Sequence, residues 1–299
     1  MTEYKVTHIT EYHYDNEASL CHNIMYKSPM EAHFQKVIDF RFEISPEPSY
    51  IVKRKDFFGN EMIYFSVDKA HEVLVVKAIS HVRLNNPDWI RIKEEKTAPW
   101  EEVVRWLQSS AASGDIKQFY LESEFVPIID EIVEYTLQSF TPGRALFDAV
   151  NELNTRINKD FAFTPGFTDI STPLEKVFSS RKGVCQDFAH FGLACLRSIG
   201  LAAKYMSGYI ETLPPPGKPK LVGSDASHAW IAVFIPDWGW VEFDSTNNLV
   251  VKNEHIRVAS GRDFSDVTPV KGIVYSSGEQ TLAVKVDVRK VASVKETLS

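Results

Sequence analysis

The chain has 299 residues, of which 44% are hydrophobic and 24% are charged, and its formal net charge is −7. This composition excludes an intrinsically disordered, collagen-like or coiled-coil protein, and the acidic balance disfavours a nucleic-acid partner. The chain shows no leader-like start and no apolar run of about 20 residues, so we expect no membrane partner. Its three cysteines are too few for a disulfide framework, which predicts free thiols and a cytoplasmic protein.

Residues 1–95 are predicted to form an antiparallel β domain. Short segments such as Lys36–Ile44 and Val73–Ala78 are rich in β-forming residues, and turn-forming residues such as Gly59-Asn60 separate them. Several short strands with regular turn signals are typical of a β-sandwich.

Residues 96–144 are predicted to form a helical connector. Apolar residues recur there at helical spacing, from Trp100 to about Phe140. The segment separates the β domain from a third region with a different pattern.

Residues 145–299 are predicted to form a further domain, including strands at the C-terminus. Helices are expected over Ala145–Ile157 and Val184–Ile199, and Gly200 ends the second helix. The expected strands follow: Ala202–Ile210, His228–Ile235, Trp240–Phe243 and Leu282–Val288. Helices first and antiparallel strands afterwards indicate an α+β fold.

Cys185 is the strongest candidate for a nucleophile. It is predicted to lie in the first turn of its helix, just after Gly183. The helix dipole and the unpaired backbone N–H groups would stabilise a thiolate there and an oxyanion formed beside it. The alternative is a small buried hydrophobe, the usual role of a free cysteine. Cys195, on the apolar face of the same helix, and Cys21, in the β domain, are expected to be inert.

His228 and Asp244 can supply a base and the group that orients it. Trp230 pairs with Asp244 if the connection between their strands is the three residues 236–238. His228 and Asp244 would then be diagonal neighbours on one face of the sheet, about 7–8 Å apart at Cα. A carboxylate at that distance can hold the imidazole in one tautomer. A two-residue connection would place the two side chains on opposite faces.

Four further residues are weaker candidates for the site. Gln186 could donate its amide towards an oxyanion. Trp230 could wall a substrate channel with Trp238, Trp240 and Phe163, although packing in the core is favoured for these aromatic residues. Arg262 and Asp263 could support the site from behind, or form a surface ion pair. The proline-rich segment Leu213–Gly223 is predicted to influence substrate choice.

The other histidines are not expected to bind a metal. His190 lies five residues after Cys185 and therefore on a different side of the helix, so a packing role is favoured over a catalytic one. The remaining histidines, including His255, show no metal-binding spacing. We therefore expect no metal and no cofactor.

Three strings carry a family resemblance: Gly-Val-Cys-Gln-Asp-Phe-Ala-His at 183–190, Ser-His-Ala-Trp at 227–230, and Gly-Trp-Val-Glu-Phe-Asp-Ser-Thr-Asn-Asn at 239–248. With them the chain resembles bacterial members of the transglutaminase-like superfamily. The resemblance implies a papain-like core after an N-terminal β domain, with Cys185 as nucleophile, His228 as base and Asp244 as orienter. The family usually has proline after the triad aspartate. Here Ser245 takes its place, which would loosen the turn but removes no catalytic atom.

Three functions remain open at this point. Hydrolysis of a peptide or amide bond through a thioester is slightly favoured, because no calcium site is recognisable and animal-type crosslinkers of the family depend on calcium. Transamidation uses the same thioester but resolves it with an amine. A non-catalytic peptide-binding module is disfavoured, because such a module has no need for a nucleophile at a helix start. The expected partner is a peptide or protein substrate, and the oligomeric state is open.

Overall fold

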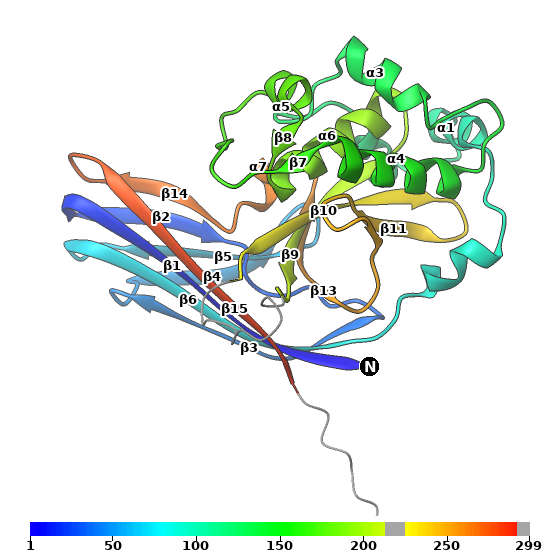
Figure 1. The fold of residues 1–299 in the computed structure, drawn as a ribbon. Helices are drawn as coiled ribbons and strands as arrows, with labels where there is room; N and C mark the ends of the chain where they lie inside the picture. The colour runs from blue at the N-terminus through cyan, green and yellow to red at the C-terminus, as the bar shows by residue number, and fades with distance from the viewer. Residues whose placement is uncertain (213–224, 292–299) are drawn as a thin grey trace, which may run out of the picture.

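A computed structural model describes residues 1–212 and 225–291. Two antiparallel four-stranded sheets form the elongated β layers on the left of Figure 1. Their strand orders are β15-β1-β6-β3 and β14-β2-β5-β4. The strands are β1 (Thr2–Ala18), β2 (Leu20–Met25), β3 (Gln35–Ser45), β4 (Tyr50–Lys55), β5 (Glu61–Val67), β6 (His71–Leu84), β14 (Val270–Tyr275) and β15 (Gln280–Val291).

The two sheets pack face to face around a core of their own. Leu74 and Val76 of the first sheet and Ile63 and Phe65 of the second belong to one cluster of fully buried side chains. Alternate residues of a strand point to opposite faces of its sheet, so the alternation in the sequence placed these side chains inside. The expected sandwich-like β domain is present.

The C-terminal strands complete this β domain rather than the catalytic region. The sequence placed the strand near Leu282–Val288 in the region 145–299, but β15 pairs with β1, with Val6 opposite Val288. Likewise β14 pairs with β2. The alternation of residues predicts a strand but does not specify which strand it pairs with. Here β15 pairs along the edge of β1 and β14 along the edge of β2.

Residues 96–144 form a series of short helices: α1 (Trp100–Gln108), α2 (Gly114–Lys117), η2 (Gln118–Tyr120) and α3 (Asp130–Leu137). The short helix η1 (Asp88–Glu94) precedes them, within the range 1–95 that was predicted to be β. Val103, Leu107 and Ile132, all fully buried, hold these helices against the rest of the molecule.

The region that was predicted to be catalytic begins with helices and continues as a sheet. Its elements are α4 (Leu146–Asp160), β7 (Ala162–Phe163), α5 (Leu174–Ser180), β8 (Lys182–Gly183), α6 (Cys185–Ser198), β9 (Ala203–Ile210), β10 (Ser227–Ile235), β11 (Gly239–Asp244), β12 (Leu249–Val250), β13 (His255–Gly261) and α7 (Phe264–Val267). The five strands β12-β11-β10-β9-β13 form one antiparallel sheet in that order. This is the α+β arrangement expected for residues 145 onward.

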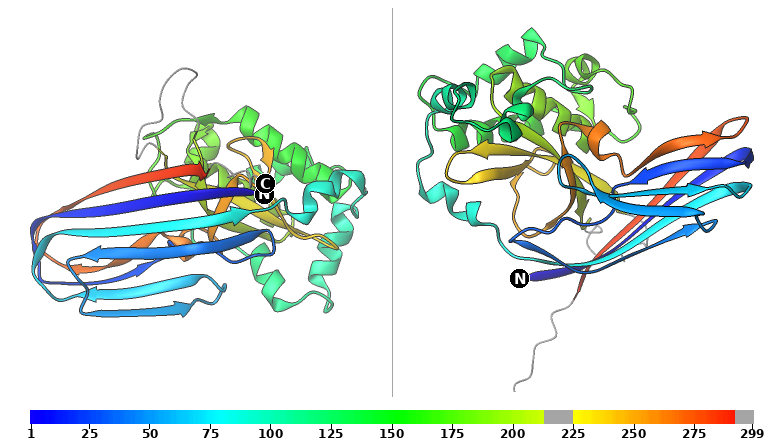
Figure 2. Two further views of the ribbon diagram at one scale, coloured as in Figure 1. Left: turned by 90° about the horizontal axis from the view of Figure 1, so that it is seen from below. Right: turned by 180° about the vertical axis from the view of Figure 1, so that it is seen from behind.

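The helix α6 lies centrally against this sheet. Gly192 lets it approach closely, because a Cβ there would lie 3.3 Å from Ile231 of β10. Gly200 follows the helix with φ +83°, the left-handed conformation that favours glycine at a helix end. Figures 1 and 2 show the helices on one side of the sheet and the N-terminal strands on the other.

One large core joins the two halves of the molecule. It contains Val6 and Val82 of the β domain together with Leu196 of α6 and Ile231 and Phe243 of the catalytic sheet. Within residues 1–212 and 225–291, no helix has the length and apolar character needed to span a membrane.

Candidate active site

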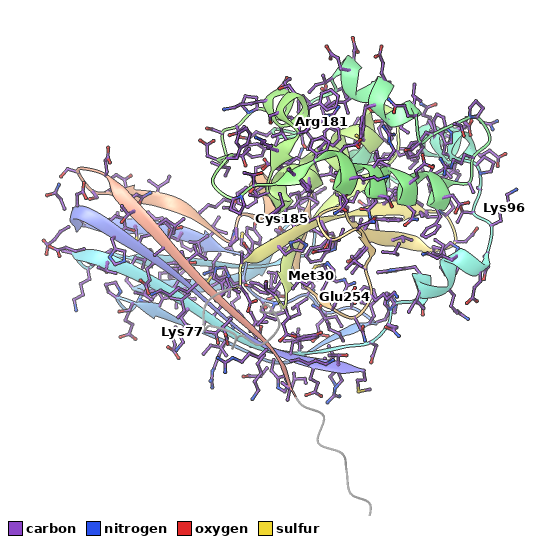
Figure 3. The ribbon with its side chains drawn as sticks, in the orientation of Figure 1. Met30, Lys77, Lys96, Arg181, Cys185 and Glu254 are labelled. Carbon is purple, nitrogen blue, oxygen red and sulfur yellow. The ribbon has the colours of Figure 1, made fainter. Side chains whose placement is uncertain are left out.

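Cys185 is the first residue of α6 and lies where the helices meet the sheet that contains β10 (Figure 3). The preceding residue, Val184, is extended, and its N–H donates to the Asp187 carboxylate at 2.7 Å, which caps the helix start. Gly183 leaves room for that carboxylate, because a Cβ at this position would lie 2.6 Å from Asp187 Oδ2. The run Gly-Val-Cys-Gln-Asp therefore starts the helix at the cysteine. The capping role of Asp187 was not recognised in the sequence, although its spacing from Val184 is typical of a cap.

The three cysteines differ in their environments. Cys21 and Cys195 are buried, whereas Cys185 is half-buried, and all three are free thiols. Burial raises the pKa of the Cys195 thiol to about 12 and also raises the pKa of Cys21. Only Cys185 combines access with a place at a helix N-terminus.

The predicted register of the two strands behind His228 and Asp244 is present. Ile235 pairs with Gly239 and Ile231 with Phe243, so the connection is the three residues 236–238. His228 and Asp244 therefore share one face of the sheet, and His228 Nε2 donates to Asp244 Oδ2 at 2.8 Å. Both side chains are buried.

His228 lies between Asp244 and Cys185. Its ring is hydrogen-bonded to the Asp244 carboxylate, and the neighbouring Cys185 side chain also acts to raise the pKa of the imidazole. Because Nε2 is held by Asp244, Nδ1 is the nitrogen left for the sulfur. Burial disfavours the charged imidazole, but the interactions with Asp244 and Cys185 outweigh it and raise the pKa of His228 to about 10. At neutral pH this arrangement favours the protonated imidazole of His228.

The Asp244 carboxylate accepts hydrogen bonds from three neighbouring residues. Its Oδ2 accepts hydrogen bonds from His228 Nε2 at 2.8 Å, His255 Nε2 at 2.8 Å and Asn247 Nδ2 at 2.7 Å. Its Oδ1 accepts from the backbone N–H of Asn247 at 3.1 Å. Burial opposes ionisation, but the hydrogen bonds from the two histidines outweigh it and hold the pKa of Asp244 well below its ordinary value.

Sequence reasoning missed two of these partners. Asn247 lies three residues after Asp244, a spacing at which a side chain commonly bonds a turn, so it could have been found. His255 lies at the start of β13, which pairs with β9 rather than with the strand of Asp244. No spacing rule predicts this contact.

Trp230 packs beside the histidines. Its ring stacks with His228 at 6.0 Å between centroids and meets His255 edge-on at 5.0 Å. It is fully buried, and its Nε1 donates to Glu242 at 2.7 Å. Gly208 gives this ring its space, since a Cβ there would lie 2.8 Å from the indole. Trp230 therefore supports His228 from the interior and is not a wall of an open channel.

Gln186 lines a cavity of about 340 Å³ beside the first turn of α6. Asp187 and His190 also line it, together with the exposed acidic residues Glu124, Asp169 and Glu175. An oxyanion role for Gln186 remains a prediction. The whole proline-rich segment Leu213–Gly223 lies outside the described residues, and its influence on substrate choice likewise remains a prediction.

Arg262 and Asp263 do not form an ion pair with each other. Arg262 pairs instead with Asp266, with 3.2 Å between Nε and Oδ2. Asp263 is buried and caps α7, accepting from the Ser265 backbone N–H at 2.9 Å and from the Phe125 backbone N–H at 3.1 Å. These contacts anchor the segment after β13, and none of them involves the triad.

Two other sequence expectations concern packing. His190 is buried, accepts a hydrogen bond from the Phe264 backbone N–H at 3.2 Å and stacks on Phe125, so it packs as expected. Of the aromatic residues considered as channel walls, Phe163 is exposed, while Trp238 and Trp240 line a separate cavity of about 330 Å³.

Ser245 does not loosen the turn after Asp244. Its hydroxyl donates to Asn154 Oδ1 of α4 at 2.8 Å. Asn158, one turn further along α4, donates to the carbonyls of Ser245 and Thr246 at 3.0 and 2.8 Å. Hydrogen bonds from a helix thus fix the turn at the position where the resemblance led us to expect a proline.

Among the described residues, one group could hold a metal ion: His228, Asp244 and His255. Each offers one ligand atom, and these atoms lie within 4.8 Å of one another. Two imidazoles and a carboxylate can bind a transition metal. The same atoms, however, make two 2.8 Å hydrogen bonds to each other, which a proton on each Nε2 explains. A metal would have to replace both protons.

Two family models match the chain. The bacterial transglutaminase-like N-terminal region matches residues 4–83, and the transglutaminase-like superfamily model matches residues 134–245, which include Cys185, His228 and Asp244. An uncharacterized protein of Mycobacterium tuberculosis is 37% identical over 292 residues, covering 95% of this chain and 92% of its own length.

Two further proteins are similar in part or in fold. The protein-glutamine gamma-glutamyltransferase of Pseudomonas aeruginosa is 33% identical over 101 residues, 32% of this chain and 15% of its own length. The crystal structure of a candidate cysteine protease from Cytophaga hutchinsonii superposes with a TM-score of 0.76 at 19% identity, covering 98% of this chain and 91% of that one. This last likeness concerns the fold.

Proposed function

The chain belongs to the transglutaminase-like superfamily, and on that premise we propose that it is a cysteine hydrolase that cleaves an amide bond of a peptide or protein through a thioester on Cys185. The observation that carries the proposal is the position of His228, which is hydrogen-bonded to Asp244 and lies near enough to Cys185 for the two side chains to interact. This is the geometry of a nucleophile, a base and an orienting group.

Acylation follows from these contacts. The Cys185 thiolate bonds to the carbonyl carbon, and the carbonyl electron pair moves to the oxygen. The N–H groups in the first turn of α6, among them that of Cys185, can stabilise this oxyanion because they lack partners within the helix. When the C–N bond breaks, the amine leaves with the proton of the His228 imidazolium. Asp244 keeps the ring oriented throughout.

Deacylation returns the site to its starting state. Water attacks the thioester carbon and gives a proton to His228, and the C–S bond then breaks to release the carboxylic acid. The thiolate and the imidazolium are restored together, so neither a metal nor a cofactor is needed for this cycle.

Transamidation is the second candidate, and one observation favours it. The cavity beside the first turn of α6 is lined by Glu124, Asp169 and Glu175, which would attract a cationic amine such as a lysine side chain. The similarity to a protein-glutamine gamma-glutamyltransferase agrees with this alternative over the matched third of the chain. The two reactions share acylation and differ only in what resolves the thioester.

The test is limiting iodoacetamide labelling followed by intact-mass analysis, comparing wild type with Cys185→Ala and His228→Ala. We expect rapid single labelling at neutral pH that is lost in Cys185→Ala and slowed in His228→Ala. Glutamine-containing peptides with and without a fluorescent primary amine would then show whether water or the amine resolves the thioester. A Cys185 that labels no faster than an ordinary thiol would overturn the enzyme proposal and favour a binding module.

We also propose that the protein acts in the cytoplasm. Its three thiols are all free in the structure, as a reducing compartment would keep them. Cell fractionation tests this proposal, and recovery of the protein in a periplasmic or extracellular fraction would contradict it.

A further inference from the structure

Asp244 carries two histidines rather than one. His255 Nε2 donates to the same oxygen, Oδ2, that accepts from His228, and both distances are 2.8 Å. The two imidazoles lie 5.6 Å apart between ring centroids. A triad needs only one imidazole on its carboxylate, so the second one requires its own explanation.

The surroundings of His255 show which of its atoms matters. The side chain is fully buried, and its Nδ1 has no hydrogen-bond partner among the described residues, the Glu254 carboxylate being 3.8 Å away. An unpaired buried nitrogen is costly, and an apolar residue of similar size would avoid that cost. The benefit of a histidine here is therefore its Nε2–H, and that group points at Asp244.

The bond has two effects on Asp244. Together with Asn247, it fixes the rotation of the carboxylate, so that Oδ2 faces His228. It also shares the negative charge of that oxygen, which lowers its tendency to take the proton from His228. A carboxylate bonded by His228 alone would be freer to turn and more basic.

We propose that His255 is a positioning residue of the catalytic site, whose Nε2–H holds the Asp244 carboxylate so that His228 stays aligned with Cys185. This inference rests on the proposed function. His255 does not touch the sulfur or the substrate, and it acts through Asp244. Trp230, packed against both imidazoles, keeps the ring of His255 in the required plane.

Two substitutions at His255 separate the donor from the packing. His255→Gln keeps an N–H donor at about the position of Nε2, whereas His255→Leu keeps an apolar side chain without a donor. The readout is the rate of Cys185 alkylation by iodoacetamide from about pH 5 to about pH 9. We expect His255→Leu to lower the rate at neutral pH by about 10- to 100-fold, and His255→Gln to restore most of it.

His71→Leu is the matched control. His71 is also buried with one unpaired ring nitrogen, but it lies at the start of β6 in the β domain. The substitution His71→Leu should leave the pH profile of Cys185 alkylation unchanged, even if it lowers the stability of the protein. If His255→Leu alkylates with the wild-type rate and pH profile, the positioning role is wrong while the proposed function stands. If wild type itself shows no enhanced labelling, the proposed function fails first.

Proton NMR gives a second readout, and its wild-type spectrum does not depend on the folding of a variant. We expect a slowly exchanging, low-field Nε2–H resonance from each of the two histidines, His228 and His255. Only one should remain in His255→Gln. Release of one equivalent of zinc or another divalent metal on denaturation of the purified protein would overturn the proposal, because the two Nε2 atoms would then be ligands rather than donors.

Discussion

At the scale of single residues, the environment of each thiol decides its chemistry. Cys21 and Cys195 are enclosed by apolar side chains, and burial raises the pKa of both. Cys185 is half-buried and has the His228 imidazole as a neighbour. The same side chain is thus part of the core at two positions and is the proposed nucleophile at the third.

Replacing His228 by glutamine should remove a pH-dependent part of the stability. The pKa of His228 is raised from an ordinary value of 6.5 to about 10, so the folded state holds this proton more tightly than the unfolded state does. Its contribution is complete below about pH 6.5 and is lost as the pH rises through about 10. We expect urea unfolding to show a wild-type advantage over His228→Gln that is larger at about pH 6 than at about pH 10.5, by about 2 kcal/mol. An advantage that is equal at both pH values would contradict this account.

At the scale of elements, the start of α6 and the connection between β10 and β11 place the reacting groups. The cap formed by Asp187 makes Cys185 the first helical residue, and the three-residue connection puts His228 and Asp244 on one face. A one-residue shift in either element would turn a catalytic side chain away from its partners.

Removing the cap should weaken both the helix and the reactivity of Cys185. Asp187→Ala is expected to cost about 1 kcal/mol of unfolding free energy, the usual effect of losing a capping side chain. It should also slow alkylation of Cys185, because the first turn that positions the thiol would fray. Asp148→Ala is the control, since Asp148 is an exposed acidic residue in the first turn of α4. Equal effects of the two substitutions would show that the cap is unimportant.

At the scale of the whole molecule, the β domain and the catalytic region fold around a shared core. Strand β15 contributes Val286 and Val288 to the core that also contains Phe243 of β11. Asp225, shortly before His228, forms a β-bridge with Val286. The end of the chain thus supports the strand that carries the catalytic histidine.

A substitution in β15 should therefore affect both halves at once. Val286→Ala, at a fully buried position, is expected to lower the unfolding free energy by about 2 kcal/mol, whereas Val284→Ala, at a position 48% exposed on the same strand, should change it little. Circular dichroism and protection of Cys195 from alkylation in urea should report one common midpoint for each variant. Separate midpoints would mean that the two regions unfold independently.

Much of the fold and the triad could be predicted from the sequence, because local patterns encode them. Period-two alternation predicted the strands, helical spacing and Gly200 predicted α6, and the count of residues between the strands predicted the contact of His228 with Asp244. Each of these depends on residues that are close along the chain.

Contacts between distant segments could not be predicted in this way. The pairing of β15 with β1, the hydrogen bond from the Phe125 backbone N–H to Asp263 and the hydrogen bond from His255 to Asp244 each depend on where a segment returns in space. A strand pattern does not specify its partner, and side chains on non-adjacent strands meet only once the whole chain has packed. The sequence by itself thus determined the elements and the candidate nucleophile, base and orienting group, while only the tertiary structure decided which strands complete the β domain and which side chains hold Asp244 in place.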